Sequence, residues 1–190
     1  MSAIRLIKIH DHVQKETPVD ADELLISDSE DSWVKKKIAI SDLPSGGGTK
    51  EYASFYLSTG GLTNVSSTAV TLVVNQTSVN SNGSVFSLSG NEVTVNKTGD
   101  FKISAECYFN NSSTTRTEYT MWLEKDTVEV AGTRAATYQR GYDSGDTAAM
   151  SIIVSVTSGD VFRLRIQRTD GSATTGYQDD NGTRFTFEEK

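Results

Sequence analysis

One stretch of the chain, Val85–Phe109, constrains the possible folds more strongly than any other. It reads VFSLSGNEVTVNKTGDFKISAECYF and holds two alternating runs, Glu92–Asn96 and Phe101–Phe109, joined by a turn at Lys97–Asp100. In the second run every other residue is apolar, and polar residues dominate between them. Because successive side chains of a strand point to opposite sides, this alternation predicts strands with one face on a core.

Similar short runs fill the chain after Gly48, and turn-forming residues separate them. Apolar residues nowhere recur with the helical spacing of 3.6 over three turns, so no helix is predicted. The pattern predicts an all-β sandwich of about ten antiparallel strands. The expected strands are Tyr52–Ser58, Ala69–Val74, Val85–Leu88, Glu92–Asn96, Phe101–Phe109, Tyr119–Glu124, Val128–Val130, Thr133–Gln139, Met150–Val156, Val161–Ile166 and Arg184–Phe187. Polar loops are expected at Asn110–Thr115, Arg140–Asp146 and Thr169–Asn181.

Residues 1–48 differ from the remainder and are predicted to form a separate segment, with residues 49–190 as the main domain. Two short strands, Glu23–Ser27 and Val34–Ile40, are expected on either side of an acidic turn. A flexible joint, Ser45–Gly48, follows them. An isolated hairpin is marginal in water, so we expect this segment to become ordered against another chain.

Composition excludes several classes of function. The net charge of −7 argues against nucleic acid as the main partner, since phosphate binding needs clustered Lys and Arg. No apolar run approaches the roughly 18 residues of a membrane helix. The first residues lack the pattern of a signal peptide, which predicts synthesis in a cytoplasm without general export. A single cysteine excludes an intrachain disulfide, and Cys107 is expected to be a buried small hydrophobe.

No catalytic constellation is visible in the sequence. The motifs GxSxG, GxxxxGK[ST] and HExxH are absent, and both histidines lie far in sequence from Cys107. We therefore expect neither an enzyme nor a bound cofactor.

The order of the strands and turns resembles the trimeric jelly roll shared by the complement collagen-type recognition head and tumour necrosis factor. The resembling segments are Gly90–Ile103, Met121–Asp126, Ser158–Leu164 and Thr183–Phe187. The chain departs from the complement pattern because no Gly-X-Y collagen stalk precedes the head. The resemblance spans Tyr52–Glu188 and implies a jelly-roll fold.

The same resemblance implies a homotrimer in which neighbouring subunits cover one sheet face. The candidates for that face are Tyr52, Phe55, Tyr56, Tyr108, Trp122 and Ile153. They sit on strands whose opposite faces already read as core. The alternative is that these side chains fill irregular gaps in the core of a monomer.

The N-terminal pattern DELLISDSEDSW…KKKIAISDL resembles short modules near the N-termini of bacteriophage head and tail fibre proteins. There such modules attach a fibre to the virion or build its stalk. The residues expected to make the attachment are Leu24, Leu25, Ile26, Ile38 and Ile40. The alternative is an acidic loop followed by a basic strand with no attachment role.

Metal binding is considered at three places. His10 and His12 project to the same side of an extended chain, so three parallel copies bring six imidazoles around one axis. The default is two histidines exposed to solvent in a flexible arm. The loops Tyr142–Asp146 and Gln178–Gly182 carry oxygen ligands that suit calcium, but plain turn chemistry explains them as well.

We therefore expect a structural protein of a bacteriophage virion, made in the host cytoplasm, that forms a trimeric head or tail fibre. Its partners are itself, other virion proteins at the N-terminus, and a glycan or protein of the host surface. The residues expected to face this receptor are Asn111, Tyr142, Asp143, Asp179 and Asp180. The alternatives are a capsid decoration or capping protein without a receptor, and a cellular complement-like binding module.

Overall fold

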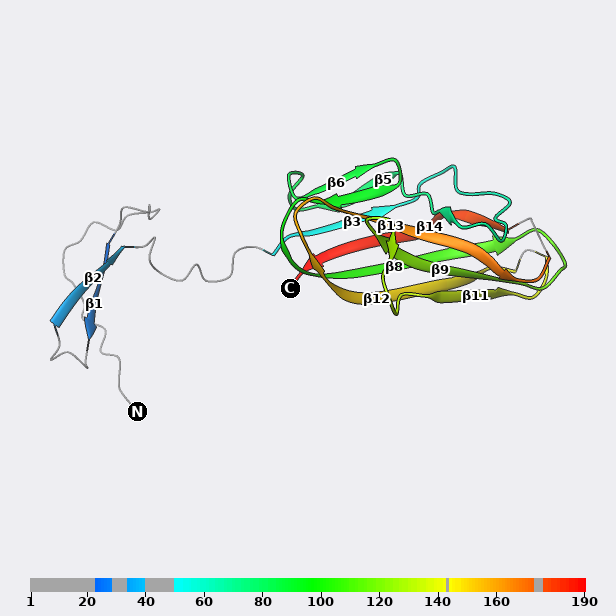
Figure 1. Cartoon of the computed structure of the whole chain (residues 1–190). Coiled ribbons are helices and arrows are strands. Elements are labelled where there is room, and N and C mark those ends of the chain that lie inside the picture. The colour runs from blue at the N-terminus through cyan, green and yellow to red at the C-terminus, as the bar shows by residue number, and fades with distance from the viewer. Residues whose placement is uncertain (1–22, 29–33, 40–49, 143, 173–175) are drawn as a thin grey trace. The chain divides into compact units, whose positions relative to one another are not determined.

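The computed structural model describes residues 23–28, 34–39, 50–142, 144–172 and 176–190 (Figure 1). All regular structure in these ranges is β-strand, which confirms the all-β prediction. The chain forms two compact units, Met1–Thr49 and Lys50–Lys190. The second unit is called the head.

The first unit contains one antiparallel hairpin. β1 (Glu23–Asp28) pairs with β2 (Val34–Ala39), so that Leu24 lies opposite Ile38 and Leu25 opposite Lys37. Both strands occur where the sequence predicts them, whereas Ile40 lies outside the described residues. This sheet has two strands, so within the described residues each strand has one edge without a backbone partner.

Two antiparallel sheets form the head. The five-stranded sheet consists of β12 (Asp146–Val156), β8 (Gly99–Asn111), β14 (Gly176–Glu189), β3 (Tyr52–Tyr56) and β5 (Gln76–Asn80), in that spatial order. The seven-stranded sheet has the order β10 (Val128–Glu129), β9 (Thr117–Lys125), β13 (Asp160–Asp170), β7 (Glu92–Val95) and β6 (Phe86–Ser89). In addition, β11 (Ala135–Gln139) pairs with β9, and β4 (Val70–Thr71) pairs with β13.

The core between the sheets is rich in phenylalanine, and Phe187 on β14 lies at its centre. The centroid of its ring is 4.6 Å from that of Phe185 and 6.2 Å from that of Phe55, both on the same sheet. It is 5.7 Å from Phe162 and 6.0 Å from Phe86 on the other sheet. All five rings are buried, so β14 joins the two sheets through aromatic packing.

The stretch that most constrains the fold forms β6, β7 and β8. Gly90 and Asn91 join β6 to β7 with φ values of 59° and 70°, a turn geometry that favours Gly and Asn. The predicted alternation of Phe101–Phe109 is confirmed, because its apolar residues face the core and the residues between them are at least partly exposed. This hairpin and core strand therefore belong to both sheets of the sandwich.

The head differs from the sequence prediction at β5 and at the C-terminal strands. The described head has twelve strands instead of about ten. β5 is not predicted because four of its five residues are exposed, so no alternation marks it. The expected loop Thr169–Asn181 is wrong, since β13 runs to Asp170 and β14 begins at Gly176. β14 pairs with β8 across a register shift between Gln178 and Thr183.

The two ends of the head are distinct. At one end the chain enters beside its own C-terminus, where the backbone N–H of Glu189 donates to the Glu51 carbonyl at 2.9 Å (Figure 1). The connections from β8 to β9, from β11 to β12 and from β13 to β14 lie at the opposite end. Register shows this, because Asn111 pairs with Gly176 and Gln139 pairs with Thr117. This opposite end is called the distal end.

Candidate binding surfaces

The outer face of the five-stranded sheet is arranged in rows that cross the strands. The middle row, called the hydroxyl row, consists of Ser54, Thr186, Ser104 and Ser151. The row on one side is Tyr52, Glu188, Lys102 and Ile153, and the row on the other is Tyr56, Arg184, Glu106 and Ala149. Small hydroxyl side chains therefore occupy the middle of the face, and larger side chains stand on both sides.

Hydrogen bonds link members of the hydroxyl row in pairs. The Oγ atoms of Ser104 and Ser151 are 2.9 Å apart, and Ser54 Oγ lies 3.2 Å from Thr186 Oγ1. Neighbouring strands thus satisfy these hydroxyls without long side chains. The face is consequently flat and polar at its centre.

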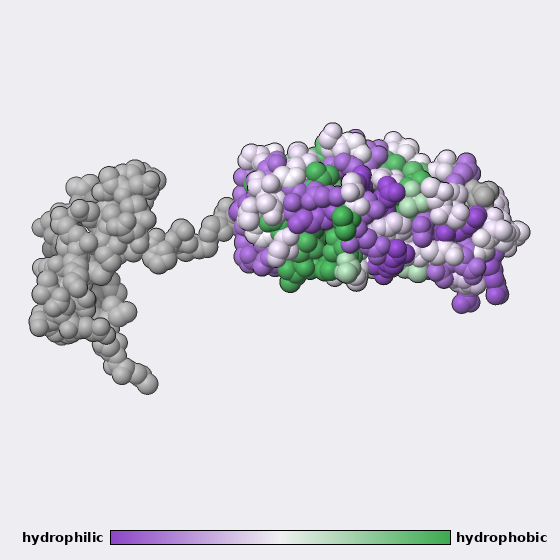
Figure 2. All heavy atoms as spheres, viewed as in Figure 1, coloured by the Kyte–Doolittle hydropathy of each residue, from purple (hydrophilic) through white to green (hydrophobic). Residues whose placement is uncertain are grey.

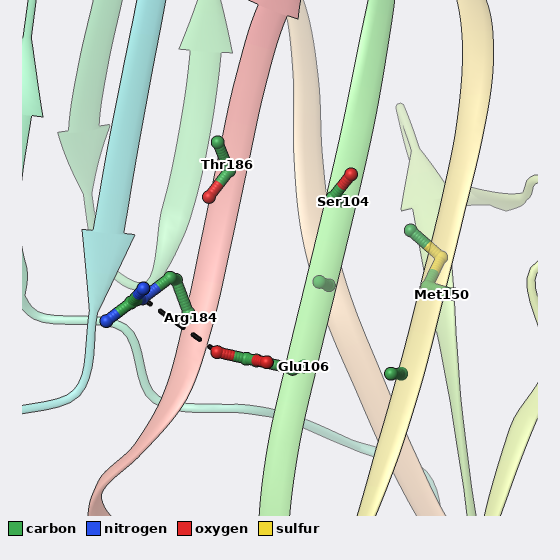
Figure 3. Close-up of a pocket in the computed structure, with 7 residues that line it drawn as sticks. Ser104, Glu106, Met150, Arg184 and Thr186 are labelled. Atoms are coloured by element: carbon green, nitrogen blue, oxygen red, sulfur yellow. Dashed lines mark ion pairs between the residues drawn. The ribbon is translucent and has the colours of Figure 1, made fainter.

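A shallow hollow of about 320 Å³ lies on this face (Figure 3). It is lined by Ser104, Ala105, Glu106, Ala149, Met150, Arg184 and Thr186. Arg184 and Glu106 point toward one another across β14 and β8, with Nε and Oε1 3.9 Å apart. Both side chains are more than half exposed, so this long ion pair contributes little to stability.

Four of the residues predicted for a subunit interface lie on this outer face. Ile153 is 63% exposed and Tyr52 is 48% exposed, whereas Tyr56 and Tyr108 are half-buried. Large exposed apolar side chains are unusual on a polar face. Tyr52 and Ile153 both lie in the same row of this face.

The predictions for Phe55 and Trp122 are wrong. Phe55 is fully buried in the core, because it alternates with Tyr56 and therefore faces the other way. Trp122 belongs to β9 of the other sheet and is 5% exposed. The guanidinium of Arg134 covers its ring at 4.9 Å and pairs with Glu129 at 2.7 Å.

Apolar side chains also reach the surface along one edge of the sandwich, where β12 lies beside β9. Lys125 Nζ on β9 donates to the Ser155 carbonyl on β12 at 3.1 Å. The partly buried Met150, Ile152 and Val154 of β12 face the core beside this contact, and they define what is called the apolar edge. Figure 2 shows hydrophobic side chains gathered over β12 on this side of the head.

The residues predicted to face a receptor do not share one environment. Tyr142 is 69% exposed at the distal end. The prediction for Asn111 is wrong, because this side chain is fully buried and accepts from the Ser113 N–H at 3.1 Å. Asp179 and Asp180 lie within β14 at its register shift and reach the surface there. Asp143 lies outside the described residues.

Three further residues lie at the distal end: Arg140 begins the predicted loop Arg140–Asp146, whereas Tyr138 and Arg116 lie outside the predicted loops. Tyr138 is 39% exposed, and the Arg140 guanidinium lies 5.9 Å from the centroid of its ring. Arg116 is exposed at the start of β9. Their positions in or next to the predicted loops were the available signal, but the sequence alone does not reveal which strands end side by side.

Arg163 and Arg165 on β13 form ion pairs within the chain. Arg163 contacts Glu92 at 2.5 Å and Glu124 at 2.9 Å. Arg165 Nε lies 3.6 Å from Glu124, and its NH2 donates to the Ala69 carbonyl. These ion pairs therefore link neighbouring strands of the seven-stranded sheet.

The structure bears on two further site predictions. Cys107 is buried, as expected, and burial raises the pKa of its thiol to about 12. Among the described residues no group of three or more His, Cys, Asp or Glu side chains is placed to hold a metal ion. His10 and His12 lie outside these residues. Asp146 of the first calcium loop instead accepts from the Tyr138 N–H at 3.1 Å.

Comparison with known proteins identifies the fold. No family model and no curated protein sequence matches the chain. Murine APRIL at pH 8.0 superposes with a TM-score of 0.54 at 13% identity, covering 75% of this chain and 100% of that one. Eiger TNF from S. frugiperda gives 0.50 at 13% identity, covering 74% and 92%. The head is a tumour-necrosis-factor-like jelly roll. None of the described segments forms a helix able to span a bilayer.

Proposed function

We propose that this chain is a homotrimeric binding module that forms the head of a bacteriophage head or tail fibre. In this proposal the chain resides in the virion, binds without catalysing a reaction, and uses its N-terminal unit to attach to other virion proteins. The observation that carries the proposal is the pairing, on one jelly roll, of a flat polar face with an apolar edge.

A closed three-fold ring needs two different surfaces on each subunit, because every contact in it is heterologous. The outer face of the five-stranded sheet and the apolar edge supply such a pair. The hollow at the hydroxyl row is lined in part by small residues, Ser104, Ala105, Ala149 and Thr186, so it has room for larger side chains from a neighbour. Met150 contributes to both surfaces, since it lines the hollow and belongs to the edge.

The area of the face suits a stable interface. Five strands at a spacing of about 4.8 Å, along a β8 of thirteen residues, span up to about 20 Å by 40 Å. The resulting area of roughly 800 Å² equals what one partner contributes to an interface of standard size.

The N-terminal hairpin supports the attachment role. Each of its strands has an open edge within the described residues, and an open edge can add a strand from another protein. Three consecutive lysines, Lys35–Lys37, lie on β2 opposite Leu25, Ile26 and Ser27. A virion protein that offers a strand flanked by acidic residues fits this edge. Adhesion is then left to the distal end, which lies away from the point where the chain enters the head.

The mass of the protein in solution tests the assembly. We expect three times the 20.6 kDa of the chain by light scattering at micromolar concentration. Ser151→Arg places a long charged side chain in the hydroxyl row and should give monomers. Ser87→Arg makes the same change at an exposed position of β6 and should leave the trimer intact. A monomeric wild-type chain, or a trimeric Ser151→Arg variant, contradicts this assembly.

Electron microscopy of the intact particle tests the virion role and separates a head fibre from a tail fibre. Deletion of residues 49–190 then tests adhesion. Particles that assemble normally but adsorb poorly to host cells support it. Particles that fail to assemble would favour a decoration or capping role instead.

A further inference from the structure

Two arginines lie one position beyond the end of the ladder between β9 and β11. The last backbone pair of this ladder is Gln139 with Thr117. Arg140 and Arg116 occupy the next register positions, and both are exposed. Like charges at opposing positions of a sheet lower the stability of the fold. The fold does not need arginine at either of these two positions.

The pair is also unneutralised, in contrast to other arginines of the head. Arg134, Arg163, Arg165 and Arg184 each have a glutamate partner within 4 Å. Within the described residues neither Arg116 nor Arg140 has an ion-pair partner. In a chain of net charge −7 carboxylates are plentiful, so the absence of a partner at these two positions indicates an anionic ligand.

Aromatic rings accompany these charges. The Arg140 guanidinium lies over the ring of Tyr138, and Tyr142 two residues later is 69% exposed. Tyrosine offers a rigid apolar face with a polar hydroxyl, which suits contact with a ring that carries hydroxyl groups. Arg116, Tyr138, Arg140 and Tyr142 together are called the distal corner.

The neighbouring backbone holds the distal corner in place. Gln139 is fully buried between Tyr138 and Arg140, and its Nε2 donates to the Phe109 carbonyl at 2.8 Å. Asp146 Oδ2 accepts from the Tyr138 N–H at 3.1 Å, so the end of β11 is tied to the start of β12. Binding therefore requires little ordering of the strand that carries Tyr138 and Arg140.

We propose that the distal corner binds an anionic sugar of a surface glycan. The guanidinium groups of Arg116 and Arg140 pair with a carboxylate or phosphate on the sugar, and the tyrosine rings pack against its pyranose face. This inference rests on the proposed adhesive function and names its ligand class. A protein receptor is the competing class.

Binding of the full-length chain to defined saccharides tests the proposal. The probes are oligogalacturonate for a carboxylate, phosphomannan for a phosphate, and unphosphorylated mannan as the neutral comparison. We expect binding to oligogalacturonate or phosphomannan, weakened by added salt, and none to neutral mannan. Arg140→Ala and Arg116→Ala should each weaken binding at least about tenfold. Tyr142→Ala should weaken it also, while Tyr142→Phe retains the ring and most of the affinity.

Arg134→Ala is the matched control, because it removes the same charge from an exposed arginine on the same sheet that already has a partner. Its affinity should stay within about twofold of wild type, since exposed ion pairs contribute little. If Arg134→Ala and Arg140→Ala weaken saccharide binding equally, the net charge of the head attracts the probe, and the proposed binding site at the distal corner is wrong. Failure to bind either anionic probe, or equal binding to neutral mannan, overturns the ligand class. Neither result depends on trimer mass or on particle assembly, so these experiments test the ligand class independently of the proposed function.

Discussion

Gln178 is the residue whose loss should most clearly destabilise the head, and its contacts allow the size of the effect to be worked out. The side chain is 3% exposed, at the register shift of β14. Its Oε1 accepts from the Val73 N–H at 3.0 Å and from the Leu62 N–H at 3.4 Å. Its Nε2 donates to the Val73 carbonyl and to Thr183 Oγ1, both at 2.7 Å. The Gln178 amide thus makes the backbone hydrogen bonds that a neighbouring strand would make, for the mostly irregular segment from Leu62 to Val73.

Replacing this residue by alanine removes these hydrogen bonds, although the Thr183 hydroxyl still donates to Cys107 Sγ at 3.3 Å. Each of the two Val73 bonds and the Thr183 bond is worth about 0.5–1.5 kcal/mol. The 3.4 Å bond adds little. Gln178→Ala should therefore lower the free energy of unfolding by about 3 kcal/mol. For a domain of this size that corresponds to a fall in Tm of roughly 6–12 °C.

Urea titration at fixed protein concentration measures the change, with concentration held constant because assembly affects apparent stability. Gln167→Ala is the control. It removes the same side chain from β13, and the amide of Gln167 makes no hydrogen bond within the described residues. The control should stay within about 0.5 kcal/mol of wild type. A Gln178→Ala variant as stable as the control would refute the reasoning that this amide organises the segment.

Three further predictions concern other parts of the head. Gly171 and Gly132 both have positive φ, 79° and 80°. Only at Gly171 would an added Cβ contact backbone atoms, those at the start of β9. In urea titration, Gly171→Ala should therefore lower the free energy of unfolding by about 1–3 kcal/mol more than Gly132→Ala does. The raised pKa and burial of Cys107 predict that at pH 8 a thiol reagent labels the native chain over about 100-fold more slowly than the denatured chain. A hydrogen bond from Lys97 lowers the pKa of Glu189, so this carboxylate stabilises the fold above about pH 4.3, and the effect is lost as the pH falls through the lowered pKa. The stability difference between wild type and Glu189→Gln should accordingly be present at pH 7 and shrink in acid.

Each of these has a contrary result. Equal destabilisation by the two glycine substitutions would mean that the backbone near β9 yields to the added methyl group. Rapid labelling of the native thiol would mean that β8 opens at its centre. A difference between wild type and Glu189→Gln that does not change from pH 7 to acid would remove the ion pair as its cause.

The sequence predicts the strands that have one buried and one exposed face. Phe101–Phe109 is the clearest example, because its alternation reports burial directly. β5 escapes prediction because exposed polar residues form it, and its pairing with β3 is decided by a neighbour distant in the chain. The C-terminal part is underestimated for a similar reason, since Gly176–Gln178 pair with β8 through backbone atoms that no side-chain pattern marks.

The candidate surfaces were predicted less well than the fold. Alternation tells which residues share a side of one strand, and it correctly groups Tyr52 with Tyr56. It cannot assign strands to sheets, so the prediction for Trp122 is wrong, because β9 belongs to the seven-stranded sheet. The positions of Arg116 and Arg140, each one residue beyond the Gln139–Thr117 pair, follow from the register of two strands that are separated by another segment of the chain. Single-sequence patterns do not contain this register.

The entry of the chain into the head has a mechanical consequence. β3 follows immediately on the first unit and is hydrogen-bonded along both sides, to β14 and to β5. A pull applied between residue 50 and the distal end acts along β3, so its ladder bonds are strained together in shear instead of opening one after another. Glu51 strengthens the attachment at this end of β3. Its N–H donates to Glu189 Oε2 at 3.0 Å, and its carboxylate accepts from Ser81 Oγ at 2.6 Å. The head is thus built to withstand tension between residue 50 and the distal end.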